Sequence, residues 1–169
     1  MWTVDFAIKL LSVIIAAVAF SILFSVRPKH LLIDAIGATA TIIIYTFIEF
    51  RGLSLFAAAF VSTVVAAIYS EGCARIGRAP TIVFLVPCLL PTIPGGALYR
   101  SMSAFLGRNY EAGLDYLMTT LKISIGIAGG IVTVSILVKI VMGFLDMIRS
   151  RGGVAVEVEK GDEEENSKI

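Results

Sequence analysis

Four long runs of apolar residues dominate the chain, at about residues 6–26, 31–50, 53–69 and 117–145. A helix needs roughly 20 apolar residues to cross a bilayer, and tilting lets segments of somewhat different length span as well. The second and third runs are joined only by Glu49-Phe50-Arg51-Gly52, which predicts a tight antiparallel hairpin. The pattern therefore predicts membrane-spanning helices.

A further apolar segment, residues 79–100, differs from these runs because it holds four of the five prolines in the chain. Pro87, Pro91 and Pro94 each remove a backbone donor and restrict the preceding residue, and a glycine pair at 95–96 follows. We therefore expect no continuous helix from Pro91 through Gly96.

We expect this segment to form two short helices, over about residues 80–90 and 97–106, on either side of a non-helical turn. The fold class is then an all-α integral membrane protein of about five transmembrane helices, the fourth broken at a Pro/Gly-rich turn. This polytopic transmembrane domain covers residues 1–150. We expect the glycines at 152–153 to end the last helix, and the acidic residues 151–169 to form a disordered tail.

Composition excludes several classes of protein. Of the 169 residues 57% are hydrophobic and 16% are charged, and the mean hydropathy is +0.91. Soluble domains are about a quarter charged, so a soluble enzyme and a disordered protein are both excluded. The net charge of +1 offers no basic surface, so we expect no nucleic-acid partner.

Two features of the last apolar run point to its environment. Gly126 and Gly130 form a G-x-x-x-G pair, which is typical of a close helix contact, either within the chain or with a partner. Lys122 and Lys139 are 17 positions apart, about 25 Å along a helix. That spacing suits two lysines that reach opposite membrane interfaces; binding of an anionic substrate is the alternative.

The basic residues predict an orientation. With five spans, eight lie on one side and three on the other: Arg27, Lys29, Arg75, Arg78, Arg149, Arg151, Lys160 and Lys168 against Arg51, Arg100 and Arg108. The first side is then cytoplasmic, with the N-terminus outside. If residues 79–100 re-entered instead of spanning, the count would be six against five. The distribution of basic residues therefore favours the interpretation that segment 79–100 is broken but still spans the membrane.

The broken segment is also where a ligand could bind. Discontinuous helices build the sites of many transporters, because half-helix ends present free amides. The amides near Gly95, Gly96 and Ala97 open a helix whose positive end suits a carboxylate. The candidate substrate-binding residues are Pro87, Pro91, Thr92, Pro94, Gly95, Gly96, Tyr99 and Arg100. The alternative is a proline-kinked helix without any ligand.

Other chemistry is sparse. Asp34, in the first turn of its segment, is interpreted as an acid stabilised by the helix dipole. Cys73 and Cys88 are interpreted as small buried side chains, and His30 lies beside a basic loop. No catalytic constellation, metal-ligand spacing or nucleotide motif is found, so we expect no enzyme, metal or cofactor.

The proline-rich segment resembles a known family. Residues 78–87 (RAPTIVFLVP) and 90–102 (LPTIPGGALYRSM) are similar to the signature of the bacterial threonine/serine exporter family. The segment at 19–24, followed by Pro28, is similar to that family's first helix, and the resemblance covers about residues 19–107. Within that family, the chain resembles the small-subunit type. Cys88 departs from the pattern, where glycine is expected after the proline.

The resemblance implies export of small carboxylate-bearing metabolites, threonine and serine or, in the split type, succinate, driven by the ion gradient of the membrane. It implies a bacterial plasma (inner) membrane and a larger subunit of the same family as partner; a homo-oligomer is the alternative. A non-transporting scaffold or regulatory subunit remains the second hypothesis. A lipid-modifying enzyme is a third, with almost no residues to support it.

Overall fold

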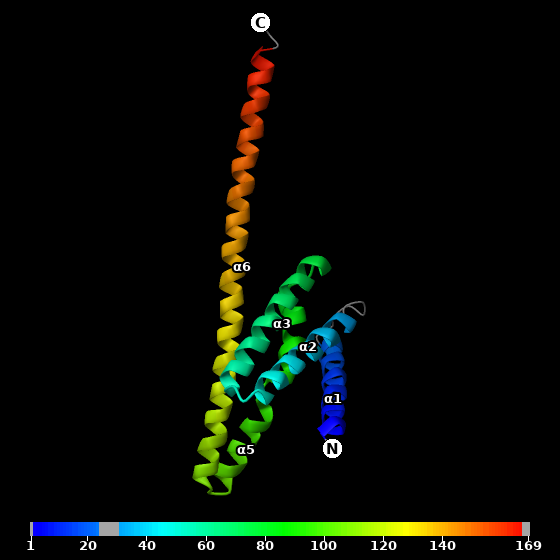
Figure 1. Ribbon diagram of the computed structural model, residues 1–169, viewed down its shortest axis with the longest axis vertical. Coiled ribbons are helices and arrows are strands. Elements are labelled where there is room, and N and C mark those ends of the chain that lie inside the picture. The colour runs from blue at the N-terminus through cyan, green and yellow to red at the C-terminus, as the bar shows by residue number, and fades with distance from the viewer. Residues whose placement is uncertain (1, 24–30, 167–169) are drawn as a thin grey trace. The chain divides into compact units, whose positions relative to one another are not determined.

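The computed structural model describes residues 2–23 and 31–166, and helices account for all the regular structure in those two ranges (Figure 1). In chain order these are α1 (Trp2–Leu23), α2 (Leu31–Phe50), α3 (Leu55–Gly77), α4 (Thr81–Leu89), the 3-10 helix η2 (Leu90–Thr92), α5 (Gly95–Leu106) and α6 (Tyr110–Asn166). The predicted all-α architecture is thereby confirmed. The basic loop at 27–29 and His30 lie outside the described residues.

Among residues 2–23 and 31–166, three helices are long and apolar enough to cross a membrane: α2, α3 and the Tyr110–Phe144 part of α6. The α4–η2 segment and α5 meet the same criterion only as a pair, bent by 51° at a short break. Such a pair is either one broken span or a loop that re-enters. The apolar part of α1 that the structure describes, Leu11–Leu23, is shorter than a full span. The described residues thus include three candidate spans, or four with the bent pair, and the count of five stays a prediction.

The predicted hairpin between the second and third runs is confirmed. Gly52 has a positive φ of 74°, a conformation that glycine adopts without steric cost, and this reverses the chain after α2. Ser54 then caps α3, because its hydroxyl accepts a hydrogen bond from the Ala57 amide at 3.2 Å. The two helices pack against each other along their length.

One broad face of α3 is buried, and its side chains are small. They recur at every fourth residue in two adjacent rows: Ala58, Ser62, Ala66, Ser70 and Ala74 in one, and Ala59, Thr63 and Ala67 in the other. In lipid, helices associate through close van der Waals packing, which small residues permit. This face lets α3 pack tightly against α2 and α4.

The first part of α6, within the unit Met1–Thr133, also packs on α3. A Cβ atom added to Gly126 would lie 2.8 Å from the Phe56 carbonyl oxygen. One added to Gly130 would lie 2.8 Å from Thr63 Cβ. The predicted G-x-x-x-G contact is therefore confirmed, as a contact within the chain.

Of the second unit, Val134–Ile169, the structure describes residues 134–166, which belong to α6. The predicted end of the helix at the glycines 152–153 is wrong, because α6 continues through them to Asn166. A glycine weakens a helix by only about 1 kcal/mol relative to alanine, which does not by itself terminate one. The disorder of the acidic tail stays a prediction.

One buried hydrogen bond joins α5 to the start of α6. The hydroxyl of Ser101, which is 1% exposed, donates to the Gly113 carbonyl at 2.8 Å. We expect Ser101→Ala to lower the free energy of unfolding by about 1 kcal/mol, since a buried acceptor loses its donor. Thermal unfolding in detergent would measure this, with the exposed Ser103→Ala as control. Equal stability of the two variants would contradict the role of the bond.

Candidate functional site

The break between η2 and α5 is caused by its prolines. Pro91 lies in the first turn of η2, where a missing amide proton is tolerated, while Ile93 is extended (ψ 126°), as residues before proline usually are. Pro94 then directly precedes α5. Two helices thus flank a non-helical connection, and their bounds agree with the predicted ones to within two residues, apart from the added turn of η2.

The N-terminus of α5 has no side-chain cap. The Gly95 amide donates back to the Ile93 carbonyl at 2.8 Å, and the Leu98 amide donates to the Pro94 carbonyl at 3.0 Å. Amides that precede the first such bond of a helix have no partner inside it. The N–H groups of Gly96 and Ala97 are therefore the ones that an anion could meet at this end.

The predicted site residues fall into two groups of different exposure. The prolines and Thr92 are buried or half-buried in α4, η2 and the connection, whereas the remaining residues are exposed on α5: Pro87, Pro91, Thr92 and Pro94 against Gly95, Gly96, Tyr99 and Arg100. The first group shapes the break, and the second surrounds the open helix end. A shared role in binding substrate stays a prediction.

Thr92 has a structural task that the sequence did not indicate. Its side chain is 4% exposed, and its hydroxyl donates to the Leu89 carbonyl at 2.7 Å. The carbonyl groups in the last turn of a helix lack partners inside it, so this bond satisfies one of them. The hydroxyl oxygen can still accept a hydrogen bond.

Packing does not explain the glycine pair at the start of α5. A Cβ atom added to Gly95 or Gly96 would meet nothing within 4 Å, and neither residue has a positive φ. Both positions therefore border open space in front of the helix end. This contrasts with Gly126 and Gly130, where neighbouring atoms leave no room.

The structure places Asp34 differently from the sequence interpretation. It does lie in the first turn of α2, but its side chain is 0% exposed. The Ser21 hydroxyl, from α1, donates to Asp34 Oδ2 at 2.7 Å, and this bond is buried. Asp34 is thus part of the contact between α1 and α2 rather than a surface acid.

A signal for the burial of Asp34 was present in the sequence. The buried residues of α2 recur on one helical face, at Asp34, Gly37, Ala38, Thr41 and Ile42. Spacings of three and four residues mark one face of a helix. Because these residues are small or polar among isoleucines, the face could have been identified as a helix contact that contains the carboxylate.

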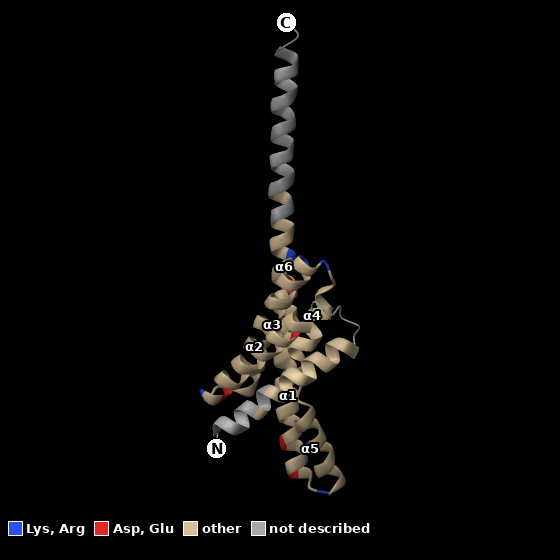
Figure 2. Cartoon of the chain, turned by 90° about the vertical axis from the view of Figure 1, so that its right-hand side faces the viewer, with Lys and Arg blue, Asp and Glu red and all other residues tan. Residues whose placement is uncertain are grey.

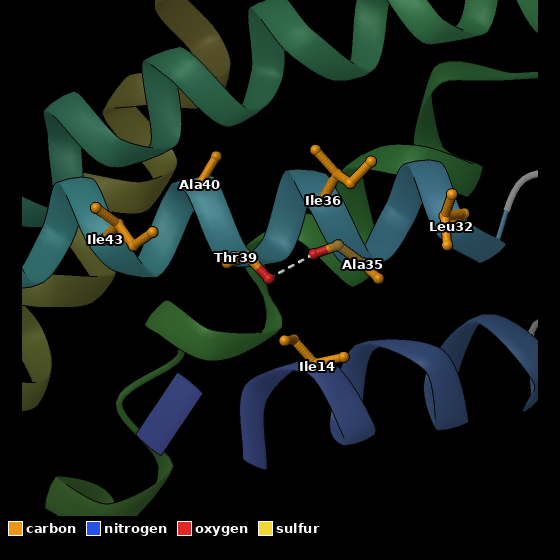
Figure 3. Close-up of a pocket in the computed structure, with 7 residues that line it drawn as sticks. All are labelled: Ile14, Leu32, Ala35, Ile36, Thr39, Ala40 and Ile43. Carbon is orange, nitrogen blue, oxygen red and sulfur yellow. Dashed lines mark hydrogen bonds between the residues drawn. The ribbon is translucent and has the colours of Figure 1, made fainter. Parts of the chain in front are cut away.

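A groove of about 460 Å³ lies along α2, with Ile14 of α1 across from it (Figure 3). It is lined by Ile14, Leu32, Ala35, Ile36, Thr39, Ala40 and Ile43. Its only hydroxyl, that of Thr39, already donates to the Ala35 carbonyl at 2.7 Å. This groove offers no group that would bind a carboxylate, so it does not compete with the break as a substrate site.

Many of the charged residues of the described chain lie near helix ends and connections (Figure 2). Lys122 and Lys139 are both exposed on α6, and their extension toward opposite membrane interfaces stays a prediction. Within the described part, no three His, Cys, Asp or Glu side chains gather as a metal site would need. Cys73 and Cys88 are free thiols, the first half-buried and the second buried.

The chain was compared with known proteins. The sequence profile of the family described as "Threonine/Serine exporter, ThrE" matches residues 9–137, well over half of the chain. Neither a curated protein nor a solved structure matches. The matched residues run from α1 into α6 and include the whole broken segment. The chain belongs to the threonine/serine exporter family.

Proposed function

We propose that this chain is one subunit of a secondary exporter that moves small carboxylate-bearing metabolites, threonine and serine or succinate, out of the cell. The family supports a transport role of the threonine/serine type. The observation that carries the proposal is the uncapped N-terminus of α5 beside a proline break. Its positive end is complementary to a substrate carboxylate.

The same segment would cross the membrane as one broken span. Backbone that leaves the helical state at membrane depth is tolerated only where it is buried in protein or lines a wet cavity. The buried Thr92 and the exposed Gly96 suit these two environments, one on each side of the connection. The topology proposed is five spans in a bacterial inner membrane, with the N-terminus outside and the C-terminus in the cytoplasm.

A larger subunit of the same family is the proposed partner. The exposed residues of α5, Gly95, Gly96, Tyr99 and Arg100, would then be covered by the partner, which would complete the substrate site. Two half-transporters that meet at such a site match the two-repeat architecture common among transporters. A homo-oligomer would use the same surface.

Replacing Gly96 with leucine tests this site. The new side chain has room, because nothing lies within 4 Å of the added Cβ, so the protein should still insert and fold. It would occupy the space in front of the α5 amides, and we expect export to fall by tenfold or more, which is about 1.4 kcal/mol. Efflux of labelled threonine, serine and succinate from cells that also hold the larger subunit measures this.

Gly72→Leu is the matched control, since Gly72 is also an exposed helical glycine with nothing within 4 Å. It should leave efflux unchanged. Normal efflux by the Gly96→Leu variant would refute the proposed site. If the variant instead lost its association with the larger subunit while remaining stable, the scaffold hypothesis would replace the present one.

A further inference from the structure

Asp34 is the only acidic side chain among the described residues that is fully buried. It belongs to α2, one of the helices long and apolar enough to span the membrane. A charged carboxylate at such a place is costly, and acids inside spanning segments commonly mark the paths of transported ions and protons. This placement demands a functional explanation beyond the packing of α1 on α2.

The hydrogen bond from Ser21 suits both protonation states of Asp34. In the structure, the Ser21 hydroxyl donates to Asp34 Oδ2 at 2.7 Å, and this bond stabilises the carboxylate. A hydroxyl has one donor and two acceptor positions, so after rotation it can accept from a protonated carboxyl group. The hydrogen bond between Ser21 and Asp34 can therefore form in both protonation states of the carboxyl group.

The titratable groups around Asp34 come from the helices packed on α2. Among the described side chains, Tyr69 of α3 and Cys88 of α4 are close enough to sense its charge, and Cys73 of α3 lies beside these two. The Tyr69 hydroxyl donates to the Ile33 carbonyl at 2.9 Å. Of these groups, only the buried Asp34 carries a carboxylate.

The same cluster is linked to the broken segment. Cys88 Sγ packs onto Gly37, one turn along α2 from Asp34, and Cys88 directly follows Pro87. The 3-10 helix η2 packs against both α1 and α2, which are the two helices joined by the bond between Ser21 and Asp34. A change at this bond would therefore be transmitted to the break.

From these contacts we propose that Asp34 is the proton-binding site of this subunit. Its carboxylate takes up a proton from one side of the membrane to form a carboxylic acid, and it releases that proton to the other side. Each protonation or deprotonation of Asp34 alters the contact of α1 with α2, and this moves the break between η2 and α5. That the proton drives export rests on the proposed export function. That Asp34 binds the proton does not depend on that function.

The test uses inside-out membrane vesicles that contain the full chain and the larger subunit. An imposed pH gradient drives uptake of labelled solute, and exchange of labelled for unlabelled solute is followed without a gradient. We expect Asp34→Asn to lose gradient-driven accumulation down to the level of vesicles without the chain, while exchange persists. Glu49→Gln, an exposed acid on the same helix, is the control and should behave as wild type.

Ser21→Ala provides a second variant that keeps the carboxylate. It removes a donor to the charged form, so the pH dependence of accumulation should shift to higher pH. Gradient-driven accumulation by Asp34→Asn at the wild-type level would overturn the proposal. Loss of both activities in that variant, with no shift in Ser21→Ala, would also overturn it and assign Asp34 a purely structural role.

Infrared spectra of the purified full chain follow proton binding without any solute. The chain has 13 acidic residues, and their carboxyl bands all grow as the pH falls. One component of this signal should be absent in Asp34→Asn and shifted in Ser21→Ala. If this component behaves as expected but the wild type moves no solute, the export function fails and the proton site stands. If export is normal and the carboxyl signal is the same in all three proteins, with no component lost in Asp34→Asn, only the proton site fails.

Discussion

Gly37→Leu is expected to prevent the helices α1 to α4 from packing, with a loss of about 3 kcal/mol or more of folding free energy. A Cβ atom at this position would overlap Cys88 Sγ and would lie 2.6 Å from Tyr69 Cε1. The Tyr69 ring cannot easily move aside, because its hydroxyl is bonded to the Ile33 carbonyl at 2.9 Å. Thermal unfolding and protein yield in detergent would measure the loss.

Two further variants isolate the cause. Ala40→Leu enlarges an exposed residue that lines the open groove on the same helix, and it should leave stability nearly unchanged. Gly37→Ala should cost about 1–3 kcal/mol, and adding Cys88→Gly should restore part of it by removing the sulfur. If Gly37→Leu were as stable as Ala40→Leu, the close approach of α4 to α2 would be disproved.

The second large effect is expected where α6 meets α3. Gly126→Leu and Gly130→Leu each push a side chain against the backbone of α3, where the nearest carbonyl oxygens would be 2.8 Å and 3.0 Å from the added Cβ. Backbone in a packed helix cannot move aside as a flexible side chain can. We expect either variant to separate the two helices, at a cost of about 3 kcal/mol.

A cysteine pair placed across the α3–α6 contact would report this separation, because its oxidative cross-linking should fail in the leucine variants. Gly129 offers the matched control on the same helix. Its added Cβ would lie 3.5 Å from the Phe60 ring, an ordinary contact distance, so Gly129→Ala should cross-link normally. Equal cross-linking in Gly126→Leu would contradict the contact.

Local chemistry made much of this fold predictable. Gly52 reverses the chain after α2, and Pro91 and Pro94 prevent a continuous α-helix from α4 into α5. These constraints act over a few residues, so they could be identified from the sequence. The glycines at 152 and 153 could not be assessed in this way, because their small penalty is opposed by the propensity of their neighbours.

The role of Asp34 was harder to predict, because burial depends on which helices meet. Its position in the first turn of α2 favours a simple dipole interpretation. Only the approach of α1, which brings Ser21 to within 2.7 Å, reveals the buried pair. The residues of the break were found from sequence, but Thr92 and Gly96 face different surroundings, which the linear pattern does not distinguish.

The two halves of the broken segment also bear on how this protein is made. Thr81–Thr92 and the 12 residues of α5 are each roughly 18 Å long at 1.5 Å per residue. A hydrocarbon core is about 30 Å thick, so neither half can enter the bilayer as an independent span during synthesis. Integration of this segment must await the helices that enclose it. Because α4 packs against α1, α2 and α3, which are all translated before it, chains that lack those helices should expose this segment to membrane quality-control proteases.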